Sequence, residues 1–425
     1  MKRTSVRIAL AVAVLFAALG ALVVALNVRD EPALDGAAAV PPTSAPAAEQ
    51  VQRGAYLARA GNCAACHTAR GRAPYAGGRG IETPFGTLYA SNLTPDAKTG
   101  LGGWSAAHFW RAMHNGRSKD GRLLYPAFPY PNYTQVTRDD SDALHAFLRS
   151  LPPMEQANRP HALRFPYGFQ ASLAVWRALF FEPGAFQPDA TKSAEWNRGA
   201  YLVRGLGHCN ACHASRNLFG ATGGSLELGG GLIPMQNWYA PSLASSREAG
   251  VADWAVDDIV ALLQAGTSPR GSVMGPMAEV VYGSTQHLAD ADLRAMAAFL
   301  KTLPQREAAP LKREAPGPAL AERGGELYAR HCAECHGDRG EGAAGAYPPL
   351  AGNRAVTMDP PANVVRIVLN GGFLPATARN PRPYGMPPFV HVLGDADVAA
   401  VTSFIRGSWG NAAGEVTVQE VQRYR

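Results

Sequence analysis

One five-residue pattern, Cys-x-x-Cys-His, constrains this chain more than any other feature because it occurs three times. The copies, called pentads below, lie at residues 63–67, 209–213 and 332–336 and use all six cysteines of the 425-residue sequence. The pattern is typical of covalent haem attachment, in which two thiols add to one porphyrin and the histidine supplies a nitrogen ligand to the iron. A redox dithiol or a zinc site explains the paired cysteines but not the repeated histidine. We therefore predict three covalently bound haem c groups.

The predicted site residues follow from this pattern. The haem attachment residues are Cys63, Cys66, Cys209, Cys212, Cys332 and Cys335, and the iron ligands beside them are His67, His213 and His336.

Each pentad stands in a repeat of three predicted helices. The first helix leads into the pentad, the second ends at a glycine typical of a C-cap, and the third has apolar residues at helical spacing after an aspartate. The first helices begin near Arg53, Arg198 and Arg323. The second helices lie at 104–116, 254–266 and 364–371, and the third helices at 141–148, 291–300 and 397–405. These periods predict an all-α fold.

The N-terminus predicts a membrane segment. Lys2, Arg3 and Arg7 precede an apolar run from Ile8 to Leu26. A bilayer-spanning helix needs ~20 apolar residues, whereas the apolar part of a cleaved signal peptide usually has only ~7–15. We therefore favour an uncleaved anchor over a signal peptide. The positive flank stays in the cytoplasm, so the haem domains are expected to face the periplasm from the cytoplasmic membrane.

The order of helix, pentad, loop, helix, methionine loop and helix resembles the c-type cytochrome domain. The resemblance implies three tandem cytochrome c domains behind the anchor. The expected segments are 1–29 (anchor or signal helix), 30–49 (Ala/Pro-rich tether), 50–152 (domain 1), 153–193 (connector), 194–304 (domain 2), 305–319 (linker), 320–411 (domain 3) and 412–425 (C-terminal tail).

The second axial position of each iron decides between electron transfer and ligand-binding chemistry. In the third repeat, the sequence Tyr-Gly-Met-Pro-Pro at 384–388 predicts Met386 as the ligand, as in cytochromes with Met/His ligation. In the second repeat Met277 is preferred and Met274 is the second choice. For each of these three methionines, the simpler alternative is that the side chain fills a gap in the core.

The first repeat departs from the pattern. Phe128 occupies the position where relatives usually carry methionine, and phenylalanine cannot ligate iron. Three alternatives are open for haem one: a five-coordinate iron, ligation by Met113 or His114, or ligation by a tyrosine from residues 125–133. Methionine ligation raises the reduction potential, so we expect the potential of haem one to differ from those of the other two.

Charge excludes one class of partner. The net charge is only +6, 17% of the residues are charged, and the basic residues are scattered, which predicts no nucleic-acid interface.

Beyond the anchor, the chain resembles the triple-haem cytochrome c subunits of membrane-bound alcohol, aldehyde and gluconate dehydrogenase complexes. The matching stretches are 90–96, 99–105, 195–202, 205–209, 275–281, 284–286, 386–389 and 408–411. The resemblance implies that a flavin or quinone subunit oxidises the substrate, and that the cytochrome carries electrons to ubiquinone or another terminal acceptor without substrate chemistry of its own. With Phe128 in place of methionine, the chain also resembles related cytochromes that serve molybdenum hydroxylases. The partner dehydrogenase is therefore left open among the flavin, quinone and molybdenum types.

Two other function classes compete with electron relay. A haem enzyme, such as a peroxidase, would use an open iron at haem one, although the sequence offers no obvious acid–base residues around it. A soluble electron shuttle would lack the anchor.

Overall fold

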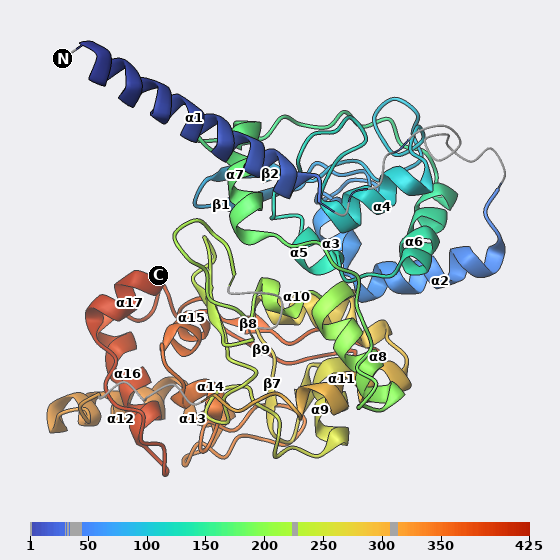
Figure 1. Ribbon diagram of the computed structural model, residues 1–425. Coiled ribbons are helices and arrows are strands. Elements are labelled where there is room, and N and C mark those ends of the chain that lie inside the picture. The colour runs from blue at the N-terminus through green and yellow to red at the C-terminus, as the bar shows by residue number, and fades with distance from the viewer. Residues whose placement is uncertain (1, 30, 32–33, 35–44, 223–227, 307–312) are drawn as a thin grey trace. The chain divides into compact units, whose positions relative to one another are not determined.

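The computed structural model describes residues 2–29, 31, 34, 45–222, 228–306 and 313–425, which fall into two compact units (Figure 1). Unit 1 consists of Met1–Ala58, Cys63–Gln187 and Leu218–Ala221. Unit 2 consists of Arg59–Asn62, Pro188–Asn217 and Thr222–Arg425. Unit 1 thus contains the first predicted repeat except residues 59–62, and most of its connector; unit 2 contains the third repeat and the second repeat except residues 218–221.

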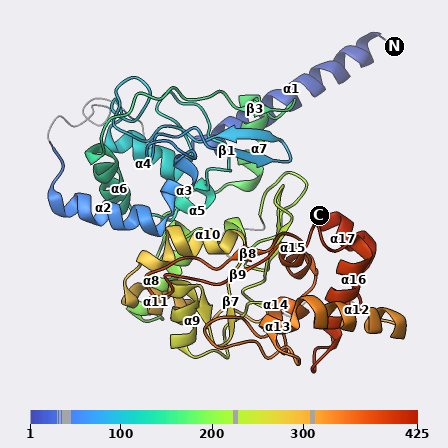
Figure 2. The same ribbon diagram turned by 180° about the vertical axis from the view of Figure 1, so that it is seen from behind.

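Helix α1 (Lys2–Asn27) carries the apolar N-terminal run. Within the described residues it is the one helix long and apolar enough to cross a membrane, with mean hydropathy of 2.9 over its most apolar stretch and no residue of that stretch buried. Figures 1 and 2 show it as a rod that leaves unit 1, with the N-terminus at its far end.

The rest of unit 1 is a helical domain with a small sheet. Strands β1 and β2 form an antiparallel hairpin with Gly80 opposite Tyr89, and β3 pairs antiparallel with β2, with Gly86 opposite Leu163. The elements are α2 (Ala48–Ala60), α3 (Cys63–His67), β1 (Gly80–Thr83), β2 (Gly86–Tyr89), α4 (Ala106–Asn115), α5 (Tyr130–Tyr133), α6 (Arg138–Ser150), β3 (Ala162–Leu163) and α7 (Gln170–Phe180).

Unit 2 begins with the second repeat. A π-helical turn, η2, links its first helix to the pentad, which starts as a short 3-10 turn, η3. The elements are α8 (Ala194–Tyr201), η2 (Leu202–Leu206), η3 (Cys209–Ala211), β4 (Gly231–Ile233), β5 (Trp238–Ala240), α9 (Val256–Ala265), β6 (Thr267–Ser268), β7 (Gly271–Ser272), α10 (Pro276–Gly283), η4 (Thr285–His287) and α11 (Asp290–Leu300).

The third repeat completes unit 2. Its core joins α12, α15, α16 and α17 through fully buried side chains such as Val365, Leu369, Val398 and Val421. The elements are α12 (Pro318–His331), α13 (Ala333–His336), α14 (Arg354–Thr357), α15 (Ala362–Asn370), β8 (Gly372–Phe373), β9 (Gly385–Met386), α16 (Asp395–Gly407) and α17 (Val418–Tyr424).

Glycine ends two predicted helices as expected. Gly116 after α4 has φ of +58° and Gly266 after α9 has φ of +78°. Glycine adopts this left-handed conformation without the steric cost that a Cβ imposes, so the chain can leave each helix in one residue. The predicted C-caps are confirmed at both positions.

The first and last helices of every repeat cross in the same way. On the first helix, an arginine pairs with an aspartate of the last helix, and the following glycine lies against a backbone carbonyl of that helix. The ion pairs are Arg53–Asp140 (2.6 Å), Arg198–Asp292 (2.7 Å) and Arg323–Asp397 (3.0 Å). The glycine and carbonyl residues are Gly54 and Ala143, Gly199 and Ala295, and Gly324 and Ala400. A side chain at any of these glycines would push the two helices apart.

Several segments differ from the sequence-based expectation. The fold is mostly helical, but short antiparallel sheets accompany the helices in both units. The connector contains a helix, α7. The C-terminal tail contains α17, whose capping box joins Thr417 and Glu420 and whose Tyr424 is buried. Both helices bury apolar side chains, which is why they form although neither was expected.

The predicted tether lies only partly within the described residues. Glu31, at its start, binds unit 1, since its carboxylate lies 2.7 Å from Arg117 and 3.6 Å from Arg111. Residues 30, 32–33 and 35–44 lie outside the described part of the chain, as do residues 307–312 of the predicted linker. The beginning of the expected tether is therefore fixed to the domain.

Candidate haem sites

The three pentads hold their thiols on short turns directly after the first helix of each repeat. The whole first pentad forms helix α3, and the last four residues of the third pentad form helix α13. The second pentad begins as a 3-10 turn, which follows His208 at φ of +38°. None of the six cysteines is in a disulfide, and Cys66 and Cys335 are exposed. The sequence-predicted pairs are thus together in space and open to an added group.

Each axial histidine makes the same hydrogen bond to a backbone carbonyl. Nδ1 lies 2.8 Å from the oxygen of Ser91 for His67, 2.7 Å from that of Pro241 for His213, and 3.1 Å from that of Pro348 for His336. A carbonyl can only accept, so Nδ1 carries the proton and the lone pair of Nε2 is left for a metal.

Burial acts on the protonation of the same rings. It lowers the pKa of His67, His213 and His336, outweighing the carbonyl hydrogen bonds that act in the other direction. A histidine must be neutral to ligate iron. The arrangement found around all three rings therefore fits an axial haem ligand.

The thiols themselves do not resemble a reactive redox pair. Burial, together with the neighbouring thiol, raises the pKa of Cys63 and of Cys209 to about 12, and that of Cys332 to about 11. Catalytic dithiols work through a lowered thiol pKa, which stabilises the thiolate. The raised pKa of these three thiols thus differs from the lowered pKa that a thioredoxin-like centre needs.

Two arginines that the sequence did not single out contact the pentads. Arg79 donates to the backbone carbonyl of Ala65 at 2.5 Å, and Arg216 donates to that of Ala211. Both carbonyls belong to the residue just before the second cysteine, although one arginine precedes β1 and the other follows the pentad by three residues. A cation at this point contributes positive potential beside a bound haem, which favours the reduced iron.

The structure places Met386 on strand β9, where it pairs with Gly372 of β8. Its half-buried side chain packs on the same core as Cys332 and Ala333 of the third pentad. Gly371 precedes the hairpin at φ of +61°, and a Cβ there would lie 2.8 Å from the peptide of Pro387 and Pro388. The methionine and the pentad therefore face one core.

Met274 and Met277 have different surroundings in the second repeat. The terminal methyl of Met274 reaches β8, where it lies 3.4 Å from the position that a Cβ on Gly372 would take. Met277 lies in the first turn of α10 and is half-buried. The side chain of Met274 is thus already packed against the third repeat.

Around the first pentad, the candidate ligands Met113, His114 and Tyr133 are all buried. His114 is buried and stacks on Trp110 with ring centroids 4.4 Å apart, and Met113 is buried on the same helix, α4. Tyr133 is also buried, and its ring lies 5.3 Å from that of Phe128.

Tyr133 is the tyrosine that lies close to the pentad. Burial raises its pKa well above the usual range, and the nearby thiols of Cys63 and Cys66 raise it further. Its phenol is therefore kept in the neutral form.

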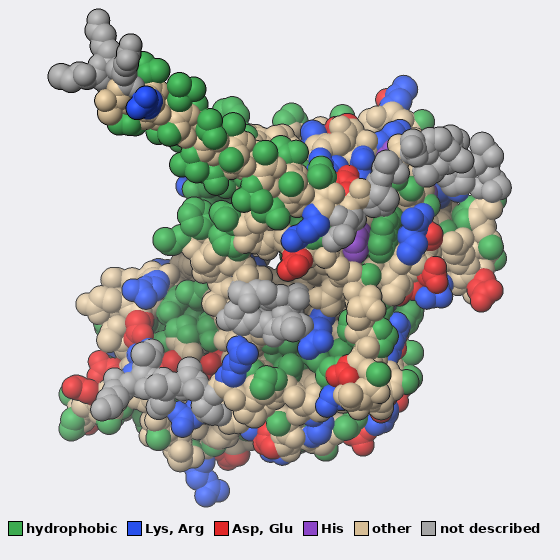
Figure 3. All heavy atoms as spheres, in the orientation of Figure 1, with side chains coloured by type: hydrophobic (Ala, Val, Ile, Leu, Met, Phe, Trp, Pro, Cys, Tyr) green, Lys and Arg blue, Asp and Glu red, His purple; other side chains and the backbone are tan. Residues whose placement is uncertain are grey.

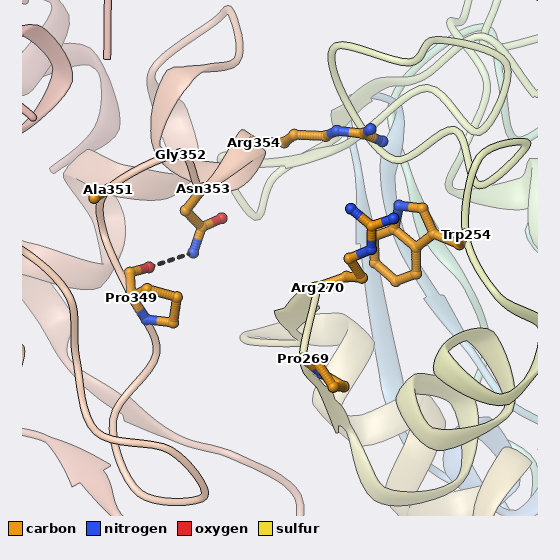
Figure 4. Close-up of a pocket in the computed structure, with 8 residues that line it drawn as sticks. All are labelled: Trp254, Pro269, Arg270, Pro349, Ala351, Gly352, Asn353 and Arg354. Carbon is orange, nitrogen blue, oxygen red and sulfur yellow. Dashed lines mark hydrogen bonds between the residues drawn. The ribbon is translucent and has the colours of Figure 1, made fainter. Parts of the chain in front are cut away.

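A pocket of about 200 Å³ in unit 2 lies apart from the pentads (Figure 4). Arg270 and Trp254 line one side and Arg354 lies across from them. Aspartates already compensate both arginines: Asp253 binds Arg354 at 3.0 Å and Asp258 lies 3.8 Å from Arg270. The pocket contains no pentad residue, although Pro349 in its lining follows the Pro348 that binds His336.

Comparison with known proteins agrees with this geometry. The cytochrome c family model matches residues 51–152 and 321–409. The alcohol dehydrogenase (quinone) cytochrome c subunit of Gluconobacter oxydans strain 621H is 39% identical over 394 residues, which cover 88% of this chain and 82% of that one. The chain belongs to the family of dehydrogenase cytochrome c subunits.

Other members of this family serve different dehydrogenases. The gluconate 2-dehydrogenase cytochrome c subunit of Pantoea cypripedii is 38% identical, with 88% of this chain and 89% of the relative covered. A nicotinate dehydrogenase subunit of Pseudomonas putida KT2440 is 41% identical over 92% of this chain, although the match spans only 32% of that protein. Membership implies covalently bound haem c and a role in electron transfer within a dehydrogenase complex.

Proposed function

We propose that this cytochrome subunit carries three covalent haem c groups and relays electrons from the catalytic subunit of a dehydrogenase to ubiquinone or another respiratory acceptor. The observation that carries the proposal is the threefold repetition of one site, with two thiols and a histidine whose Nδ1 is held by a backbone carbonyl. Bound haem iron supplies one-electron redox chemistry. The protein attaches the group, orients the histidine and sets the electrostatic surroundings.

The attachment residues in this proposal are the six cysteines, and the proximal ligands are the Nε2 atoms of His67, His213 and His336. The carbonyls of Ser91, Pro241 and Pro348 fix the ring orientations. Because each hydrogen bond holds the proton on Nδ1, it also increases the basicity of the ligating nitrogen.

On the opposite side, Met386 and Met277 are the proposed sulfur ligands of haem three and haem two. The packing of Met274 against Gly372 supports Met277 as the ligand of haem two. Haem one has Phe128 in the methionine position, so it lacks the sulfur ligand proposed for the other two; the three alternatives for its second axial position stay open, and the raised pKa of Tyr133 disfavours the phenolate that would ligate iron. We therefore propose a lower potential for haem one than for the other two.

The proposed organisation keeps three cytochrome c domains, at 50–152, 194–304 and 320–411. The repeated crossing of first and last helix in each domain supports this division. Helix α1 is proposed as an uncleaved anchor in the cytoplasmic membrane, with the haem domains in the periplasm. Lys2, Arg3 and Arg7 before the apolar run support this orientation.

The partner dehydrogenase is proposed by class. Relatives named for alcohol, gluconate and fructose dehydrogenases support an alcohol- or sugar-oxidising flavin or quinone enzyme. The relative named for nicotinate dehydrogenase supports a molybdenum hydroxylase that acts on an N-heterocycle.

The test is intact mass spectrometry of full-length protein produced with a periplasmic haem-attachment system. We expect three added macrocycles, and two after the double substitution Cys209→Ser with Cys212→Ser. A redox titration should then show three one-electron steps, and ubiquinone in proteoliposomes should oxidise the reduced protein. Free thiols, or fewer than three macrocycles on the native chain, would contradict the proposal.

A second candidate function rests on Phe128. If haem one is five-coordinate, its iron can bind small molecules and act as a peroxidase. Carbon monoxide difference spectra and peroxide turnover of the purified chain distinguish the two. We expect no change of the haem spectrum with carbon monoxide and no peroxide turnover. Peroxide turnover that is retained in M386A and M277A but lost in H67A would favour the enzyme.

A further inference from the structure

Unit 1 exposes a group of large apolar side chains beside the base of α1. They come from α7, from the loop before it and from a short segment of unit 1 near residue 219. This group, called the α7 patch, consists of Phe165 (84% exposed), Phe169 (56%), Val175 (47%), Leu179 (67%), Leu218 (94%) and Phe219 (60%). Soluble surfaces rarely gather so many large apolar side chains in one place, and such patches mark contact sites.

Helix α7 arranges these side chains in a continuous band. Successive residues turn by about 100° around a helix, so Leu173 and Arg177 share one face and Val175 and Leu179 lie opposite. Leu173 and Arg177 are buried, whereas Val175 and Leu179 are exposed. The outer face of α7 is therefore apolar.

The two flanks of this outer face continue the band. On one side Phe180 lies 6.0 Å from Phe219, and the Trp176 indole donates to the Phe219 carbonyl at 2.9 Å. On the other side Ala174 meets the end of α1. Figure 3 shows hydrophobic side chains running from the rod of α1 onto the surface next to it.

Asn27, the last residue of α1, ties the anchor directly to α7. Its side-chain amide donates to the carbonyl of Ala174 at 2.8 Å and accepts from Nε of Arg177 at 2.9 Å. Arg117 donates to the backbone carbonyl of Asn27 at 2.9 Å. Asn27 is itself buried. The end of the apolar helix is thus built into unit 1, with no spacer between them.

The length of the anchor then sets the height of α7 above the membrane. The apolar run from Ile8 to Leu26 is about 28 Å long at ~1.5 Å per residue, and the hydrocarbon core of a bilayer is ~30 Å thick. A helix of this length is only just long enough to cross the hydrocarbon core, so Asn27 lies at the edge of that core. Since Ala174 and Arg177 contact Asn27, α7 lies at that edge as well.

We propose that the α7 patch is inserted into the headgroup and upper acyl region of the bilayer that α1 spans, so that unit 1 rests on the membrane in a fixed orientation. The occupant is lipid because the patch is continuous with the surface of a membrane-spanning helix. Phenylalanine, tryptophan and leucine on an exposed helix face suit this region. The charged pair at the end of α7, Arg29 and Glu182 at 3.9 Å, marks where the surface returns to water. The inference rests on the proposed anchor role of α1.

Photo-crosslinking of the full-length, haem-loaded protein in phosphatidylcholine–phosphatidylglycerol liposomes tests it. Benzoylphenylalanine replaces Leu179, and in a matched variant it replaces Met154, which is also in unit 1 and 41% exposed but does not belong to the patch. We expect about tenfold more lipid adduct at position 179 than at position 154. Leu218, at 94% exposure, offers a second patch position where substitution leaves packing unchanged, should the Leu179 variant lose its haem spectrum.

The outcomes separate this inference from the anchor. An intact α1, read from the mass of the mature chain, with no excess lipid adduct at positions 179 and 218 overturns the inference and leaves the anchor standing. A mature chain without α1 overturns the anchor and, with it, the inference that rests on the anchor. A protein adduct in place of lipid at position 179, in the purified complex, would assign the patch to a partner protein and overturn the inference.

Discussion

Gly54 of α2 lies directly against the backbone carbonyl of Ala143 in α6, so close that a Cβ at Gly54 would overlap the carbonyl and lie 2.8 Å from the Cβ of Phe147. The same contact occurs at Gly199 with Ala295 and at Gly324 with Ala400. In each repeat, the distance between the first and last helices is thus set by a missing side chain.

The substitution Gly54→Ala should therefore destabilise unit 1 although alanine is the better helix former. Separating the two helices should outweigh the gain in propensity and lower the free energy of unfolding by about 2 kcal/mol. Urea unfolding followed by circular dichroism measures the change. Gly184→Ala is the control, because nothing lies within 4 Å of the Cβ it adds. Equal stability of both variants would show that the crossing tolerates a methyl group.

The substitution Phe128→Met should raise the potential of haem one. It restores a sulfur at the position that relatives use for ligation, and axial ligands shift haem potentials within a range of ~0.8 V, so a rise on the order of 0.1 V is expected. A redox titration of native and variant protein would show one of three midpoints moving upward.

Tyr133→Phe provides the matched control for this haem. It keeps the ring that packs on Phe128 and removes only the phenol oxygen. If Tyr133 acts on haem one, the spectrum of that haem changes in the variant. Three matching methionine-type midpoints in the native protein would contradict the whole assignment of haem one.

The two methionines of the second repeat should respond differently to removal. Met277→Ala is expected to abolish the sulfur-to-iron charge-transfer band of haem two and to lower its midpoint by on the order of 0.1 V or more. Met274→Ala should leave both unchanged and cost about 2 kcal/mol of stability, because it removes a side chain packed on Gly372. The reverse result would assign Met274 as the ligand.

His145 should make unit 1 sensitive to acid. Burial, reinforced by the positive charges of Arg149 and Arg138, lowers the pKa of this histidine from 6.5 to about 4 in the folded protein. The unfolded chain therefore binds the proton first as the pH falls. Stability is fully present above pH 6.5, falls by about 1.4 kcal/mol per pH unit below it, and levels off near pH 4 after a loss of about 3 kcal/mol.

Thermal unfolding between pH 7 and pH 4 measures this loss, and His145→Gln should flatten the dependence. The imidazole packs 5.5 Å from the Phe109 ring, and its Nε2 has no hydrogen-bond partner among the residues that the structure describes. An unchanged pH profile in the variant would place the acid sensitivity elsewhere.

Local sequence signals predicted the parts of this protein that depend on local chemistry. The pentads follow from fixed spacing, and the helix ends at Gly116 and Gly266 follow from a conformation that glycine adopts easily. The helix in the connector did not follow, because the N-cap residue of α7, Phe169, provides no side-chain cap and the apolar residues of α7 surround almost the whole helix. A hydrophobic period cannot be recognised when the outer face is apolar too.

The contacts around the candidate haems were hidden for a different reason. The partners of the histidines are backbone carbonyls of Ser91, Pro241 and Pro348, and every residue carries such a group. Arg79 and Arg216 reach equivalent carbonyls from different places in the chain, so no shared spacing identifies them. Only the folded backbone brings these groups together.

The terminal methyl of Met274 lies 3.4 Å from the place that a Cβ on Gly372 would take, and Gly372 pairs with Met386, so the methionine segments of the second and third repeats are neighbours. If Met277 and Met386 ligate their irons as proposed, these neighbouring segments hold the second and third redox centres at a constant separation. Electron exchange between them would need no domain motion, so its rate should not fall when glycerol raises the viscosity of the solvent.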